Sequence, residues 1–279
     1  MKDDSNLSGA GISRRHLLKG GMVTAAVAVS GLAWETETIT VTHHRLTMKG
    51  LRGSSRLVQL SDLHRSWCVS ESFLSRVVER AISLHPDTIA LTGDFVTGHS
   101  SYMETCARQL KRLTAPQGIF AVLGNHDYRC DNWKGAPAIS EGLHAIGVEM
   151  LTNNSQKLDC GARIIGIDDY DTGKPDADAA FGKITDSEPM VAITHNPLLF
   201  SILKGYRCVT LAGHTHGGQI DIPFLTPLLM DSRSRYLRGW FQAKGWPGKM
   251  YVSRGLGVLG IPVRFNAAPE ISVFDLEPY

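Results

Sequence analysis

The chain has 279 residues, of which 43% are hydrophobic and 20% charged, and its formal net charge is +2. This is an ordinary globular composition with room for one large domain or two small ones, and no cluster of Lys and Arg after the first twenty residues indicates nucleic acid as a partner. The five cysteines form no Cys-x-x-Cys pair, so neither a zinc knuckle nor a thioredoxin-like site is indicated, and free packing thiols are expected.

Residues 1–33 are expected to be a targeting segment. The run Ser13-Arg14-Arg15-His16-Leu17-Leu18-Lys19 precedes fourteen uncharged residues, 20–33, and resembles a twin-arginine export signal. The twin-arginine translocase would then be a partner during export, and the protein would be exported across the cytoplasmic membrane or anchored to it. The apolar run is shorter than a typical transmembrane helix, so the segment could be either cleaved off or kept as a membrane anchor. A basic, disordered tail is the alternative.

The next segments alternate between strand and helix patterns. Residues 34–54 are expected to be a linker with edge strands, and 55–279 to form the main domain. Strands are predicted at 57–60, 88–92 and 119–122, each with a continuous apolar pattern. Ser70 is a predicted N-cap for an amphipathic helix that Pro86 stops, and a second helix is predicted at about 101–113. This order predicts an α/β fold.

The second half continues with a helix at 137–146 and strands at 148–151, 163–167, 190–194 and 208–211. We expect Asp168, Asp169 and Asp171 to form a solvated acidic loop, with a further metal site as the alternative. Residues 220–246 are predicted to be a long loop packed over the sheet edge. The alternative is an apolar, basic rim that accepts a lipid tail or rests on a membrane surface. Its side chains are Phe224, Leu225, Leu228, Leu229, Met230, Tyr236, Leu237, Trp240, Phe241 and Trp246, with Arg233, Arg235 and Arg238.

Five predicted strands end on a possible metal ligand or acid. These residues are Asp62 and His64, then Asp94, then Asn125 with His126 and Asp127, then His195, and finally His214 and His216. In a largely parallel sheet such ends converge on one edge, where ligands normally bind. An amide oxygen suits a hard or borderline cation, and the neighbouring imidazole can carry a proton. Taken alone, the Asn125 stretch also fits a polar turn that caps a helix.

These motifs resemble the calcineurin-like metallophosphoesterase superfamily. The five parts occur in order: Asp62-x-His64, Gly93-Asp94, Gly124-Asn125-His126-Asp127, His195 and Gly213-His214-x-His216. The resemblance implies a four-layer αββα sandwich of two mixed β-sheets flanked by helices. It also implies one metal held by Asp62, His64, Asp94 and His216. A second metal would be held by Asp94, Asn125, His195 and His214, so that Asp94 bridges the pair.

The resemblance further implies a dinuclear metal-dependent phosphoesterase that cleaves a phosphodiester or pyrophosphate bond by attack of a metal-bridging hydroxide. His126 would protonate the departing oxygen, and Asp127 would hold its ring. Nitrogen and oxygen ligands permit manganese, iron, zinc or cobalt. A phosphomonoesterase and a non-catalytic, metal-binding relative are the alternatives.

The sequence departs from the superfamily at one position, where Thr97 replaces the last acid of Gly-Asp-x-x-Asp. The longer motifs, such as Ser253-Arg254-Gly255-Leu256-Gly257, look like YaeI/YkuE-type bacterial phosphoesterases, a group related to enzymes that cleave the lipid A precursor UDP-2,3-diacylglucosamine. That nucleotide-linked lipid is found on the cytoplasmic side of the membrane, which conflicts with its being the substrate of an exported enzyme. Arg254 and Arg264 are weaker candidates for phosphate contact, with salt bridges as the alternative.

Overall fold

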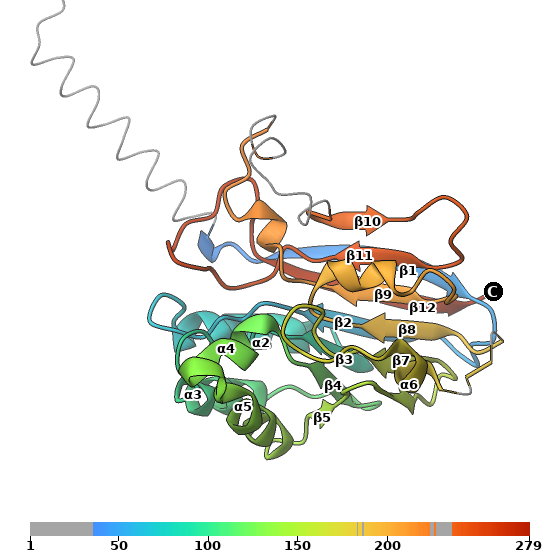
Figure 1. Ribbon diagram of the computed structural model, residues 1–279, viewed down its shortest axis with the longest axis horizontal. Helices are drawn as coiled ribbons and strands as arrows, with labels where there is room; N and C mark the ends of the chain where they lie inside the picture. The colour runs from blue at the N-terminus through green and yellow to red at the C-terminus, as the bar shows by residue number, and fades with distance from the viewer. Residues whose placement is uncertain (1–35, 183, 186, 224–225, 227–235) are drawn as a thin grey trace, which may run out of the picture.

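The computed structural model describes residues 36–182, 184–185, 187–223, 226 and 236–279 (Figure 1). The expected targeting segment, 1–33, lies outside these residues. So do Phe224, Leu225, Leu228, Leu229, Met230, Arg233 and Arg235 of the predicted 220–246 loop. Within the described residues, no helix combines the length and the apolar character needed to cross a membrane.

Two mixed sheets of six strands each form the centre of the fold. The first sheet has the order β1 (Thr40–Met48), β12 (Glu270–Pro278), β2 (Ser55–Leu60), β3 (Thr88–Thr92), β4 (Ile119–Val122) and β5 (Glu149–Met150). The second has the order β10 (Gly239–Phe241), β11 (Lys249–Val252), β9 (Val209–Ala212), β8 (Met190–Ile193), β7 (Arg163–Gly166) and β6 (Asn154–Lys157).

Helices cover the outer face of each sheet, as the pattern of buried side chains shows. The helices α2 (Glu71–Ser83), α3 (Tyr102–Leu110) and α5 (Gly135–His144) share one apolar core with the first sheet. The helix α6 (Ala177–Phe181) and the 3₁₀ turn η1 (Pro197–Ser201) share another with the second. A third core, which includes Leu57, Phe120 and Leu211, lies between the sheets. The predicted four-layer sandwich is therefore confirmed.

The helix α2 forms for the reasons that its sequence indicates. The side-chain oxygen of Ser70 accepts a hydrogen bond from the backbone N–H of Phe73, which satisfies one of the free donors of the first turn. The buried side chains recur at helical spacing along one face, namely Phe73, Leu74, Val77, Val78 and Ala81. The result is a crossover that lets β2 and β3 run parallel, so that their carboxyl ends share one edge.

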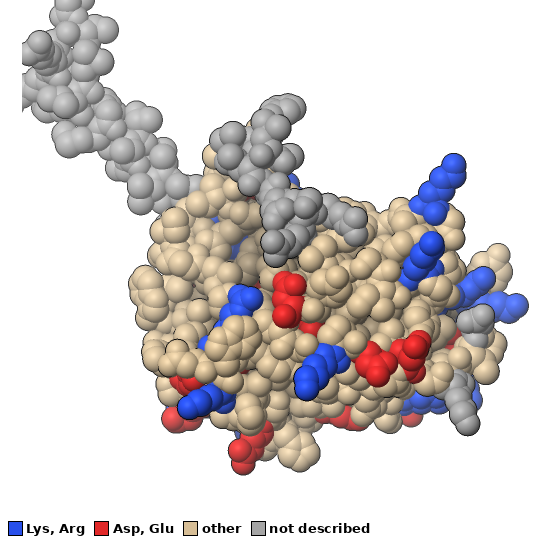
Figure 2. Space-filling view, viewed as in Figure 1, with Lys and Arg blue, Asp and Glu red and all other residues tan. Residues whose placement is uncertain are grey.

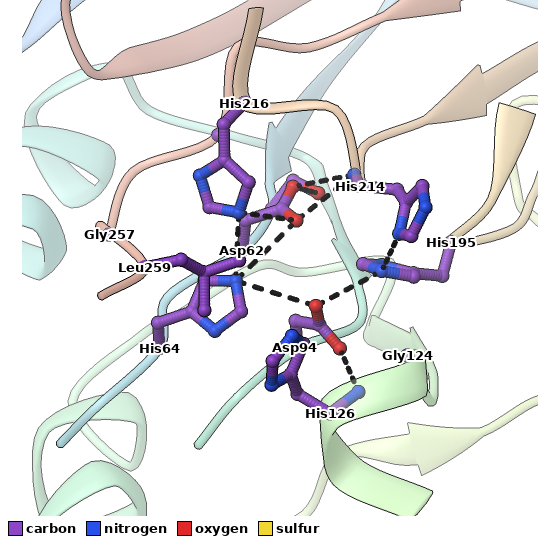
Figure 3. Close-up of polar contacts among 12 residues, drawn as sticks. Asp62, His64, Asp94, Gly124, His126, His195, His214, His216, Gly257 and Leu259 are labelled. Carbon is purple, nitrogen blue, oxygen red and sulfur yellow. Dashed lines mark hydrogen bonds and ion pairs between the residues drawn. The ribbon is translucent and has the colours of Figure 1, made fainter. Parts of the chain in front are cut away.

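The strands β2, β3 and β4 are parallel, and so are β7, β8 and β9. The carboxyl ends of each set lie along one edge of its sheet, and both edges open toward the same place (Figures 1 and 3). The strand β1 lies at the edge of the first sheet and pairs over nine residues with β12, so part of the expected 34–54 linker belongs to this sheet.

The described part of the 220–246 segment packs against the second sheet. The strand β10 pairs with β11, which places a sheet strand inside the predicted long loop. Tyr236, Phe241 and Trp246 pack on the core beneath η1. The Trp240 ring lies edge-on to His44 at 5.5 Å and keeps 38% of its surface exposed.

Candidate metal centre

The predicted ligands meet at the carboxyl ends of the strands (Figure 3). Asp62 and His64 follow β2, Asp94 follows β3, His195 follows β8, and His214 and His216 follow β9. The helix α4 (Asn125–Trp133) follows β4 and begins at Asn125, so the expected loop is the first turn of a helix. Two clusters have ligand atoms within 4.8 Å of one another, Asp62 with His64 and His216, and Asp94 with His195 and His214.

Asp94 lies between the two clusters. Its Oδ2 is 3.1 Å from Nε2 of His195 in the second cluster and 3.4 Å from Nε2 of His64 in the first. The side-chain oxygen of Asn125 lies 3.1 Å from the same nitrogen of His195. One carboxylate oxygen thus faces both sets of imidazoles, which is the arrangement expected of a bridging ligand.

The donor set fits two divalent cations. In the first cluster, Nε2 of His64 and Nε2 of His216 are 2.9 Å apart, and Oδ1 of Asp62 is 3.5 Å from the latter. All three side chains are buried, so water cannot satisfy these facing lone pairs. Nitrogen and oxygen donors of this kind suit manganese, iron, zinc or cobalt, and they do not select among them.

Two contacts behind the ligands orient the imidazole rings. The carbonyl oxygen of Thr92 lies 2.9 Å from Nδ1 of His195. Because a carbonyl only accepts, Nδ1 carries a proton, and Nε2 is the ring nitrogen that can face a cation. The hydroxyl of Thr97 lies 2.6 Å from Nδ1 of His64. Sequence reasoning did not assign Thr97 to the site, although its departure from Gly-Asp-x-x-Asp marked the position.

The electrostatics of the clusters favour bound cations. Burial lowers the pKa of His64 and His216, and in His216 the guanidinium of Arg264 lowers it further. Burial opposes the charge on Asp94, yet His195 and His64 hold its pKa well below the usual range. Burial lowers the pKa of His195, but Asp94 outweighs this effect and raises it well above the ordinary value. A cation at the second cluster would therefore displace a proton from His195.

Five ligand residues adopt left-handed backbone conformations. The φ angles are +55° for Asp62, +47° for His64, +58° for Asp94, +74° for His214 and +52° for His216. Such a conformation costs roughly 1 to 2 kcal/mol for a residue with a Cβ atom, and Asp and His tolerate it better than most. Packed neighbours must hold it in place. The backbone N–H of His214, for example, donates to Oδ1 of Asp62 at 3.0 Å.

Gly93 explains how the loops come so close. Its φ is +83°, and a Cβ atom there would lie 2.6 Å from the backbone nitrogen of Gly124 and 2.9 Å from Nδ1 of His195. Any side chain would push the β3 and β4 loops apart. The glycine before Asp94 is therefore required by the close approach of the two loops that carry ligands.

His126 lies beside the ligands without belonging to either cluster. Its ring is edge-on to that of His64, with centroids 5.0 Å apart, and it is half-buried. Its backbone N–H donates to Oδ1 of Asp94 at 2.8 Å, which positions the residue. The imidazole is thus close to the centre and still partly open to solvent.

Asp127 has a different role from the one expected. Its two carboxylate oxygens accept four backbone N–H groups, those of Asp94, Phe95, Val96 and Gly124, at 2.8 to 3.3 Å. Both oxygens are therefore engaged with the backbone, and they tie the loop after β3 to the start of α4. The four donors favour the charged carboxylate, whereas burial and the nearby charge of Asp94 raise its pKa to about 8. Cations beside Asp94 would weaken the second of these effects.

The acidic loop after β7 is buried, which corrects the expectation that it is solvated. Asp169 is 0% exposed and Asp168 is 7% exposed, and only Asp171 faces the solvent. Asp168 accepts a hydrogen bond from the hydroxyl of Tyr128 at 2.5 Å, and Asp169 accepts the N–H and hydroxyl of Thr172. Neither metal-competent cluster of the described residues includes these acids. The loop thus anchors α4 to the second sheet.

The two arginines proposed as weak phosphate contacts are engaged elsewhere. Arg254 pairs with the buried Glu270 at 3.2 Å. Arg264 is 0% exposed and donates to the carbonyl oxygens of Gly257 and Ala267. Both side chains therefore hold the loops behind the site, and for Arg254 this contact is the salt bridge given above as the alternative.

Comparison with known proteins agrees with this geometry. The family model of the calcineurin-like phosphoesterases matches residues 55–218, so the chain belongs to this family. It is 30% identical to the uncharacterized metallophosphoesterase YkuE of Bacillus subtilis over 95% of this chain and 98% of that protein.

Two further relatives have more specific names. The UDP-2,3-diacylglucosamine pyrophosphatase LpxG of Chlamydia muridarum is 28% identical over 78% of this chain and 82% of its own length. A transmembrane protein with a metallophosphoesterase domain from Danio rerio is 28% identical over 93% of this chain. The chain spans only 62% of that relative's length.

Proposed function

We propose that this protein is a dinuclear metal-dependent hydrolase of a phosphodiester or pyrophosphate bond. The observation that carries the proposal is the position of Asp94, whose Oδ2 faces an imidazole nitrogen of each cluster at 3.1 and 3.4 Å. When bound, two adjacent divalent ions lower the pKa of a water held between them and clamp a phosphoryl group for in-line attack. Membership of the calcineurin-like phosphoesterase family supports this reading.

The residues of the chain have separate tasks in this proposal. The ligands of the first site are Asp62, His64, Asp94 and His216, and those of the second are Asp94, Asn125, His195 and His214. The charge on Asp94 reduces repulsion between the two cations that it faces. Asp127 holds the Asp94 loop against α4 through four backbone bonds, which positions rather than activates the acid.

His126 is the proposed general acid. It is next to the ligand Asn125, its ring is half-buried, and it is not needed to hold either cation. Its imidazole would give a proton to the oxygen that departs from phosphorus. An alkoxide or phosphate leaving group is thereby released in neutral or less charged form.

A substrate panel tests the bond type. The metal-replete protein is given an aryl phosphate monoester, the matching bis-aryl diester and a pyrophosphate diester, and its metal content is measured by elemental analysis. We expect turnover of the diester or pyrophosphate to exceed that of the monoester. A much faster monoester reaction would identify a phosphomonoesterase instead. No turnover of any ester by a metal-loaded sample would favour a non-catalytic relative.

We further propose a lipid-linked substrate, with UDP-2,3-diacylglucosamine as one candidate. The support is the similarity to LpxG, whose name gives that substrate, and to a transmembrane relative. The proposed cell-envelope location rests on Arg14 and Arg15 in the first 33 residues. Replacing both arginines with lysine should keep the protein in the cytoplasm, and normal export of that variant would reject the twin-arginine signal.

A further inference from the structure

Four large apolar side chains are exposed together at one end of the molecule. Ile220, Ile222, Ile261 and Phe265 keep 38%, 44%, 59% and 41% of their surface in contact with solvent. We call these four residues the apolar rim. Single exposed apolar side chains are ordinary at a protein surface, whereas groups of them commonly mark contact surfaces.

Two neighbouring segments of the chain carry the apolar rim. Ile220 and Phe265 form a parallel β-bridge, and the backbone N–H of Asp221 donates to the carbonyl oxygen of Phe265 at 2.9 Å. The side-chain amide of Gln219 donates to the carbonyl oxygen of Ile261 at 3.1 Å. These bonds hold the segments 219–222 and 261–265 side by side.

The backbone alternation shows that the apolar side chains point outward. Asp221, between Ile220 and Ile222, is only 6% exposed and accepts a hydrogen bond from Arg238 at 2.6 Å. Arg264, next to Phe265, is fully buried. The charged members of both segments thus face inward and the apolar members face outward, the reverse of the usual arrangement at a protein surface.

The described chain begins beside this rim. The backbone N–H of Arg264 donates to the hydroxyl of Thr36 at 2.9 Å. Only Trp34 and Glu35 separate Thr36 from Ala33, the last of the fourteen uncharged residues at 20–33. Three steps along the chain span at most about 10 Å, so a bilayer that held the uncharged segment would also meet the rim.

The rim also adjoins the metal centre. Arg264 contacts Nδ1 of His216 at 3.3 Å, which connects the rim segment to a ligand of the first cluster. In Figure 1 the blue start of the described chain and the red loop between β11 and β12 lie at the left end, and the C-terminus lies at the right. Figure 2 shows several Lys and Arg side chains that project at the right of the molecule, on the side of the C-terminus.

We propose that the apolar rim docks on the surface of a phospholipid bilayer and holds the metal centre at the membrane interface. Side chains of this type bury a few ångströms below the headgroups, and apolar area rather than charge supplies the affinity. The consequence for substrate choice rests on the proposed function: the scissile phosphate would belong to a headgroup that stays in the membrane.

Site-specific quenching tests the docking without any need for turnover. Ile261→Cys is labelled with an environment-sensitive fluorophore in a Cys68→Ser background, since the other four cysteines are buried. The full chain is incorporated into phosphatidylcholine vesicles that carry a nitroxide on the lipid acyl chain. The control is Tyr279→Cys, because Tyr279 is 95% exposed at the opposite end. We expect the label at 261 to lose most of its emission and the label at 279 to keep it.

Equal emission at the two positions would overturn the proposal. So would a lipid-free dimer that Ile261→Glu dissociates, because the rim would then bind a second copy of the chain.

A second variant connects the rim to substrate access. Ile220→Glu combined with Ile261→Glu should lower turnover of a vesicle-embedded phosphodiester by about tenfold or more, because two half-exposed isoleucines lose their favourable burial. Turnover of a water-soluble diester should stay unchanged, since neither side chain belongs to the metal centre. Equal loss with both esters would point to a damaged site and contradict the docking role.

Discussion

Replacing Asp127 with asparagine tests whether this residue positions a loop or orients an imidazole. The carboxylate accepts four backbone N–H groups, two on each oxygen. Asparagine keeps one oxygen, so in either orientation of its amide two of the donors would face an NH₂ group. Each buried donor left without an acceptor costs about 1 to 3 kcal/mol, which gives a range of about 2 to 6 kcal/mol.

The lower end of that range is the expected result for Asp127→Asn. Burial and Asp94 raise the pKa of Asp127 to about 8, so the charge is itself unfavourable in this place. The neutral amide removes that disadvantage and offsets part of the loss. We therefore expect the free energy of unfolding to fall by about 2 to 3 kcal/mol. The Asp94 loop should also loosen, and metal content should drop.

Urea unfolding followed by tryptophan fluorescence measures this loss in the chelated protein at pH 7. The matched control is Asp131→Asn, because Asp131 is half-exposed, accepts one backbone N–H, from Ser100, and otherwise contacts the exposed His99 ring. Its effect should stay within about 0.5 kcal/mol. The loop-positioning role would be refuted by an Asp127→Asn variant that keeps the stability and the metal content of the parent chain. Such a variant would also have to lose as much turnover as His126→Ala.

Three further predictions concern the metal centre and the pH response. Asp94→Asn should lower the metal content measured by elemental analysis, because the residue that faces both clusters loses its charge, whereas Asp275→Asn at the far sheet edge should not. His126→Ala should keep its metal and lose turnover by roughly 10² to 10⁴-fold, as expected for a general acid, and parallel loss of metal would contradict that role. Burial lowers the pKa of His44, so its contribution to stability is fully present above the unfolded value of 6.5 and falls as the pH drops below it. His44→Phe, which keeps the stacking on Phe274, should therefore flatten the fall in melting temperature between pH 7.5 and 5.5, and an unchanged slope would show that other histidines cause it.

The elements that sequence reasoning predicted are those with local causes. The helix α2 has its own cap at Ser70, its own apolar face and a terminating Pro86, so nearby residues suffice to define it. The convergence of ligands followed from a local fact as well, because each ligand comes directly after an apolar strand and parallel strands end at one edge. The strand β6 was not predicted, since its residues Asn154–Lys157 are polar and mostly exposed.

The features that were missed depend on contacts between distant segments. Asp168 is buried because Tyr128, forty residues earlier, donates a hydrogen bond to it. Asp127 accepts hydrogen bonds from the loop after β3, which lies 32 and 33 residues earlier, and no local pattern shows that its oxygens point there. The left-handed backbone at ligands such as Asp62 and His214 likewise arises only when two loops meet. Local patterns predict which residues gather, whereas the assembled fold decides what each one does.

The insertion of β12 between β1 and β2 has a consequence for the order of biosynthesis. Thr40 pairs with Glu270 across 230 positions of sequence, so the strand that joins β1 to the centre of its sheet is synthesised long after β1. Until β12 has been made, β1 has no neighbour in its sheet, and the first sheet stays incomplete at the edge where the described chain begins. The pairing of β1 with β12 therefore reports that both ends of this sheet have been synthesised and brought together. Deleting 270–279 should leave β1 unpaired, and limited proteolysis should then cleave the variant faster than the full chain.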